Sequence, residues 1–99
     1  MKKFKFKLES VLRYRKYKER LAQLELVKAK YAVINKTNQI KTLIETRGST
    51  IDELRNKEDE GIMAGTYRIY ANYIFGLEKN IETEKNVLID LQKEMKKQQ

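Results

Sequence analysis

Few side chains in this sequence are of the types that carry out catalysis or bind metal ions. The chain has no His and no Cys, which removes the commonest general base, thiolate nucleophiles, disulfides and zinc fingers. Asp52, Asp59 and Glu60 do not have the spacing of an EF-hand loop. Gly61 and Gly65 are not followed by the Lys–Ser/Thr pair of a phosphate-binding loop. We therefore expect no enzymatic activity, no metal site and no cofactor.

Basic side chains are abundant and gather at the start of the chain. The 99 residues include 22 Lys and Arg against 14 Asp and Glu, for a net charge of +8. Residues 1–20 hold nine of the basic residues and only two of the acidic ones. Nearly all of the excess positive charge therefore lies in the first fifth of the chain, where a charged partner would meet it.

The elements that carry these side chains are predicted to be long helices. The sequence has no Pro and four Gly, and a composition rich in Lys, Glu, Leu and Ile is typical of long helices and coiled coils. The length predicts a single domain, residues 1–99, in which residues 1–9 form a flexible basic arm. No 18-residue apolar run and no signal peptide is visible, so we expect a cytoplasmic protein.

The first helix is expected over about residues 10–59. Apolar side chains recur at helical spacing and share one broad face that thins around Lys36. They are Leu8, Val11, Tyr14, Ala22, Leu26, Ala29, Val33, Ile40, Leu43 and Ile44.

Gly48 lies within this predicted helix and is a candidate for its end. Ile51 and Leu54 continue the apolar face in the same phase, which favours a helix that runs straight through Gly48 at a cost of about 1 kcal/mol relative to Ala. The alternative is a short break, after which Ser49 or Thr50 caps a new helix.

The chain is predicted to reverse at about residues 60–65, with Thr66 as the N-cap of a second helix over about 66–97. In this helix nine positions step alternately by three and four residues, and only Glu84 among them is polar. They are Tyr67, Tyr70, Ile74, Leu77, Ile81, Glu84, Leu88, Leu91 and Met95. The predicted fold class is all-α: two long helices that form an antiparallel coiled-coil hairpin.

The two predicted helices differ in length, so part of the first one is expected to project alone. If the turn is centred near residue 62, residue i faces about residue 125 − i, and Gln99 faces about Leu26. The projecting part carries a second, narrower apolar stripe in which Tyr17, Leu24 and Tyr31 are spaced by seven. Either this stripe belongs to a wide core face or to scattered surface groups, or it binds a partner.

Two stretches of the sequence resemble the FliJ family of flagellar type III export proteins. The opening run Phe4-Lys5-Phe6-Lys7-Leu8-Glu9-Ser10-Val11-Leu12-Arg13-Tyr14-Arg15 resembles the start of the family. Gly61-Ile62, Tyr70, Tyr73-Ile74, Leu77-Glu78-Lys79 and Ile81 resemble its turn and second helix. The resemblance implies a coiled-coil hairpin similar to the stalk of rotary ATPases, at the cytoplasmic face of the membrane.

The resemblance further implies partners. A FliJ-like stalk enters the hexameric export ATPase FliI, promotes its assembly and activity, contacts the export gate protein FlhA, and is linked to the escort of export chaperones. The ATPase contact lies at the end of the hairpin that holds the termini. In this sequence the matching residues are Arg13, Arg15, Lys16, Tyr17, Lys18, Arg20 and Leu21.

The implied gate contact falls on Gln39 and Leu43 of the first helix and on Tyr73 and Leu77 of the second. Coiled-coil core is the competing interpretation of the two leucines. Departures from the family pattern put this contact in doubt, and they fall at Thr46, Thr50, Asn80 and Glu84. The second helix is also shorter than the family usually has, so we expect either a short member or a missing C-terminal segment.

Other functions remain as alternatives. A stalk of a virulence-type secretion system would have the same architecture. A basic coiled coil that binds nucleic acid would show affinity that falls steeply with salt, although nucleic acid is not the expected partner because both helices are too long for a helix-turn-helix. Weak self-association through the uncovered apolar side chains is also compatible with the pattern.

Overall fold

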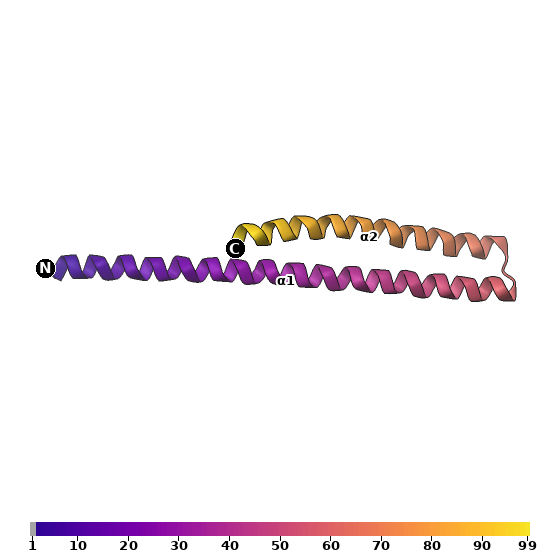
Figure 1. Ribbon diagram of the computed structural model, residues 1–99, viewed down its shortest axis with the longest axis horizontal. Helices are drawn as coiled ribbons and strands as arrows, with labels where there is room; N and C mark the ends of the chain where they lie inside the picture. Colours follow the sequence, from indigo (N-terminus) through magenta and orange to yellow (C-terminus); the bar gives the residue numbers. More distant parts are fainter. Residues whose placement is uncertain (1) are drawn as a thin grey trace.

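The computed structural model is a hairpin of two helices, and it describes the backbone of residues 2–99 and the side chains of residues 5–99. Helix α1 spans Lys2–Glu60 and helix α2 spans Ala64–Gln98. The molecule measures 90 × 16 × 16 Å, because α1 alone, at 1.5 Å per residue, is close to 90 Å long. α2 folds back along the second half of α1, and the N-terminal part of α1 projects past the C-terminus (Figure 1). The predicted fold class is confirmed.

Two helix boundaries differ from the prediction. α1 begins at Lys2 instead of near residue 10, so residues 2–9 continue the helix and do not form a separate extended arm. The flexibility of this segment stays a prediction, and Met1 lies outside the described residues.

The reversal takes three residues, Gly61 to Met63, instead of six. Gly61 has φ +91°, a left-handed conformation that glycine adopts at the end of a helix without the steric penalty of a Cβ atom. Its N–H donates to the carbonyl oxygen of Glu58 at 3.1 Å. The predicted N-cap, Thr66, is wrong: the N-cap is Met63, in extended conformation and without a side-chain capping bond. One positive φ suffices for the reversal, so Gly65 and Thr66 fall inside the first turn of α2.

α1 continues through Gly48 without a break, as the phase of its apolar face predicts. Four threonines of this region, Thr37, Thr42, Thr46 and Thr50, each donate a hydroxyl hydrogen bond to the carbonyl four residues earlier, at 2.7–3.1 Å. This bond satisfies a hydroxyl group within the helix, and it lets Thr50 be buried.

The core is a narrow seam between the helices, with alternate steps of three and four residues on both sides. On α1 the half-buried or buried positions that follow these steps are Leu26, Ala29, Val33, Lys36, Ile40, Leu43, Arg47, Thr50, Leu54 and Lys57. On α2 they are the predicted positions from Tyr70 to Met95. Ile44, predicted on the core face, and Tyr67, predicted in the repeat, are 45% and 46% exposed, because both lie at the margins of the seam.

Candidate protein-binding surfaces

The N-terminal third of α1 has no helix beside it. We call its residues 5–25 the overhang: all of them are exposed, and Leu26 is the first residue that α2 partly covers. The overhang holds seven basic and three acidic side chains. The expected start of this projecting part, near Leu26, is confirmed. The overhang is therefore an exposed helix with a net positive charge.

All seven residues expected to bind an ATPase lie on the overhang, and all are exposed. They do not share one face. Arg15 falls on the line of the seam, whereas Tyr17 and Leu21 lie on the far side of the helix, 58% and 42% exposed. Lys18 places its Nζ 5.0 Å from the centre of the Tyr14 ring, a cation–π contact that holds an aromatic ring against the helix.

The second apolar stripe, which we call the outer stripe, lies on the face of α1 that points away from α2. Its members Leu24 and Tyr31 are 52% and 63% exposed. Tyr31 belongs to the part of α1 that pairs with α2, and its side chain is nevertheless exposed to solvent. The outer stripe is therefore not part of a wide core face, and its binding to a partner stays a prediction.

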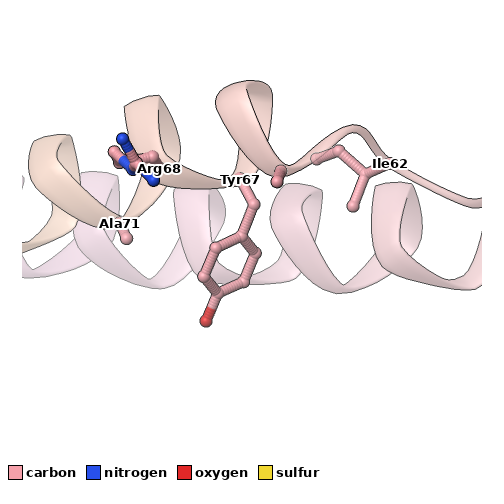
Figure 2. Close-up of a pocket in the computed structure, with 5 residues that line it drawn as sticks. Ile62, Tyr67, Arg68 and Ala71 are labelled. Atoms are coloured by element: carbon pink, nitrogen blue, oxygen red, sulfur yellow. The ribbon is translucent and has the colours of Figure 1, made fainter.

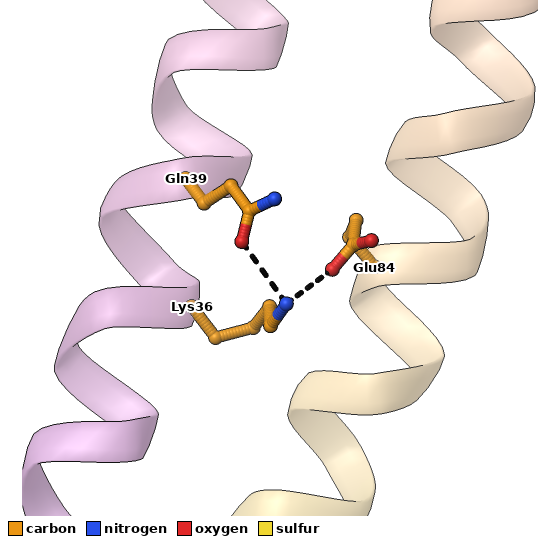
Figure 3. Close-up of polar contacts among 3 residues, drawn as sticks. All are labelled: Lys36, Gln39 and Glu84. Carbon is orange, nitrogen blue, oxygen red and sulfur yellow. Dashed lines mark hydrogen bonds and ion pairs between the residues drawn. The ribbon is translucent and has the colours of Figure 1, made fainter.

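The seam contains one ion pair that the sequence prediction missed. Lys36 Nζ lies 2.6 Å from Glu84 Oε2, with the two side chains 21% and 24% exposed. Lys36 also donates to Gln39 Oε1 at 3.0 Å. Figure 3 shows the ammonium group of Lys36 between the amide of Gln39 and the carboxylate of Glu84. The apolar face of α1 thins at Lys36, and the repeat of α2 has one polar residue, Glu84. Both interruptions have the same cause, because the two side chains form this ion pair.

The predicted register explains why this pair was missed. A residue i facing 125 − i would place Lys36 opposite Ile89, which is instead 48% exposed. The register itself is not shifted, since Arg47 meets Glu78 as 125 − i requires. The Lys36 side chain instead extends about one helical turn along α2 to reach Glu84. Both polar positions were visible in the sequence. Requiring each buried charge to face an opposite one would have found the pair.

Two further polar contacts flank the seam. Arg47 Nη2 lies 2.9 Å from Glu78 Oε1, with both side chains partly exposed. Tyr70 donates its hydroxyl hydrogen bond to Glu53 Oε1 at 2.9 Å. This hydrogen bond, helped by desolvation and by the negative charge of Glu53, raises the pKa of Tyr70 above its ordinary value of 10.0. These contacts couple the two helices at their edges.

The four residues expected to contact an export gate protein are only partly available. Leu77 is 6% exposed and lies in the seam, and Leu43 is half-buried there. The core interpretation thus describes where both leucines lie. Tyr73 is 52% exposed, and Gln39 is exposed as well. Gln39 and Tyr73 each precede a seam isoleucine, so they lie on the same flank of the hairpin but in different layers.

An open groove lies at the turn end of the hairpin. Ile62, Ala64, Tyr67, Arg68 and Ala71 line it. Figure 2 shows the Tyr67 side chain extending from the first turn of α2, with Ile62 on one side and Arg68 and Ala71 on the other.

The described residues offer no gathering of three or more carboxylates that could hold a metal ion. Across residues 2–99, neither helix is apolar over a length sufficient to cross a membrane.

Comparison with known proteins gives one match. A family model described as FliJ, flagellar FliJ protein, matches residues 4–99. No curated protein and no solved structure matches the chain.

Proposed function

The chain belongs to the FliJ family, whose members are components of the flagellar export apparatus, and from this membership we propose that it is the stalk that joins the export ATPase FliI to the export gate protein FlhA. The stalk has no catalytic role of its own: it binds the ATPase ring, promotes its assembly and activity, and escorts export chaperones.

The overhang is the observation that carries this proposal. It is a single helix that presents seven basic side chains without a covering helix, and the whole hairpin is 16 Å across. Such a projection can enter the lumen of a ring, where acidic or polar groups attract the positive charge. The paired part of the hairpin, in which α2 packs along α1 from Leu26 to the turn, remains outside.

The gate contact is proposed for the flank that carries Gln39 and Tyr73. Both side chains reach solvent, whereas Leu43 and Leu77 support the flank from inside the seam. Two of the departures from the family pattern, Thr50 and Glu84, lie in the seam as well, so they concern the pairing of the helices more than the surface that a partner meets.

The ATPase contact is tested by ATP hydrolysis of the cognate ATPase with and without the chain. The test variant changes Arg13, Arg15, Lys16, Lys18 and Arg20 to Glu. A matched control makes the same change of charge at exposed positions beside α2 or on it: Lys30, Lys41, Arg55, Arg68 and Lys93. We expect stimulation by the parent and by the control, and none by the test variant. Equal stimulation by the test variant would move the contact away from the overhang.

The gate contact is tested by titrating the soluble part of the gate protein with Tyr73→Ala and Phe75→Ala chains. The two aromatic residues have similar exposure, 52% and 59%, and lie on opposite flanks of α2. We expect only Tyr73→Ala to weaken binding, by about tenfold, as loss of an interface aromatic anchor does. Equal weakening by both substitutions would argue against this flank.

A further inference from the structure

The side of α1 that points away from α2 carries a coiled-coil repeat of its own. Steps of three and four residues lead from Leu24 to Val27, Tyr31 and Ile34, whose side chains are 47–63% exposed. Each lies two residues before a seam position, and two residues turn a helix by about 200°, away from α2. The same steps extend this line, which includes the outer stripe and which we call the outer face. Its residues, all exposed, are Arg13, Tyr17, Arg20, Leu24, Val27, Tyr31, Ile34, Asn38, Lys41 and Glu45.

The residue types along the outer face are arranged symmetrically about residue 29. The four apolar side chains form the centre, and polar or aromatic residues follow in complementary order on both sides. If two α1 helices pack antiparallel about a two-fold axis at this centre, residue i meets residue 58 − i of the other copy. Beyond the apolar centre, the pairs are Arg20 with Asn38, Tyr17 with Lys41, and Arg13 with Glu45.

The apolar centre then becomes a continuous core. Leu24 meets Ile34 of the second copy, and Val27 meets its Tyr31. The two-fold axis repeats both contacts, so four consecutive layers are apolar on both sides. This is the a-to-d packing of an antiparallel coiled coil, and it covers side chains that are about half exposed in the single chain.

The outer pairs match in charge and chemistry. Glu45 is the one carboxylate of the outer face, and it meets the guanidinium of Arg13. Lys41 meets the ring of Tyr17, a cation–π pair of the kind that the chain already forms twice, with 5.0 and 5.2 Å between ammonium and ring centre. A shift by one heptad loses both pairs, because it places Glu45 against Phe6. Charge therefore selects the register 58 − i.

The remaining positive charge opposes the pairing of two copies only weakly. Lys28, at the edge of the outer face, comes near its symmetry mate, but Glu25 of its own helix lies 3.7 Å away and supplies a counter-charge. The net charge of +8 per chain is largely screened beyond about 8 Å at physiological salt.

We propose that the outer face is the docking site for a second copy of the chain, in an antiparallel two-fold dimer with the register 58 − i. The patch is small, so Kd lies between about 1 μM and 1 mM. The dimer covers Arg13, Tyr17 and Arg20, three of the residues assigned to the ATPase contact, and is therefore a resting form that ATPase binding displaces. Its test needs no ATPase, so it can fail separately from the proposed function.

Sedimentation equilibrium at physiological salt measures the dimer. The test variant is Tyr31→Ala, and the matched control is Phe75→Ala, which removes an aromatic side chain of similar exposure, 59% against 63%, from α2. We expect Tyr31→Ala to weaken the dimer by about tenfold or more, because each dimer loses two central rings, and Phe75→Ala to change it by less than about twofold. Circular dichroism checks that both variants keep the helical content of the parent.

Disulfide cross-linking reads the register, because the chain has no cysteine of its own. A Leu24→Cys chain is mixed with an Ile34→Cys chain under oxidising conditions. In the proposed register the two thiols share a layer and can form a disulfide, whereas two Leu24→Cys chains hold theirs about 15 Å apart along the axis. We expect mixed dimers only. Efficient cross-linking of Leu24→Cys to Val27→Cys instead would overturn the register.

A charge swap tests the outer pair. Arg13→Glu should weaken the dimer, and the double change with Glu45→Arg should restore it, whereas Arg15→Glu, off the outer face, should have a smaller effect. Three results would overturn the inference: a parent chain that stays monomeric at about 1 mM, equal weakening by Tyr31→Ala and Phe75→Ala, and no recovery in the charge-swapped chain.

Discussion

The Lys36–Glu84 pair offers the sharpest test of how this hairpin is held together. Replacing Glu84 by Gln keeps the size of the side chain and removes its charge, which leaves the Lys36 ammonium in the seam with neutral amide oxygens as its partners and no counter-charge. Removing one partner of a fully buried pair costs about 3–5 kcal/mol. Here both side chains keep more than a fifth of their surface exposed, and Lys can turn its head toward water.

The expected cost is therefore lower, about 1–2 kcal/mol. For a chain of this length a loss of 1 kcal/mol lowers Tm by about 4–8 °C, so the Glu84→Gln chain should melt about 5–15 °C below the parent. Circular dichroism at 222 nm follows the melting, and urea titration gives the free energy of unfolding. The double change Lys36→Met with Glu84→Met should recover the loss, because both charges leave and apolar surface fills the layer.

We expect a coupling free energy of about 1 kcal/mol or more between Lys36 and Glu84, measured by a double-mutant cycle. Additive effects of the two single changes would refute it, as would a Glu84→Gln chain as stable as the parent. The Met–Met chain should also lose some specificity of register, because a single polar layer selects one alignment of helices. Sedimentation should then show additional oligomers that the parent does not form.

Three other predictions follow from single positions. Glu53→Gln should lower the pKa of Tyr70 toward its ordinary value, since the hydrogen bond to a carboxylate raises it, and ultraviolet titration of the phenols checks this. The parent should lose the stability that this contact contributes as the pH rises through that raised pKa, and urea titration at increasing pH checks this loss. Gly48→Ala should stabilise the chain by about 1 kcal/mol, because nothing lies within 4 Å of the added Cβ, whereas Gly61→Ala should destabilise it by about 1–2 kcal/mol because of the positive φ; urea titration showing the same sign for both would contradict the account of the turn. Leu77→Ala should lower the free energy of unfolding by about 2–4 kcal/mol, because Leu77 is a seam residue with 6% exposure. A negligible loss in urea titration would contradict its role in the core.

Sequence reasoning reached the parts of this structure that depend on local pattern. The repeat from Tyr70 to Met95 predicted α2 correctly, because a regular spacing of apolar side chains has one helical solution. The phase of Ile51 and Leu54 predicted correctly that α1 passes through Gly48. The unequal lengths of the two helices predicted the overhang. All of these follow from the geometry of one helix at a time.

The register of the two helices follows from the position of the turn, and Arg47 meets Glu78 as that register requires. Only the packing shows that the Lys36 side chain reaches about one helical turn along α2 to Glu84. The three-residue turn followed from the same packing, which needs one left-handed residue, Gly61, and no more.

The sequence by itself thus determined the class of the fold, the uneven charge and the uncovered end. The tertiary structure decided which side chains are free to bind. It buried Leu77 and left Tyr73 exposed, and it turned the outer stripe away from α2. The physical reason is that burial depends on which surface of one helix meets the other, and a local pattern cannot fix that choice until a partner helix is in place.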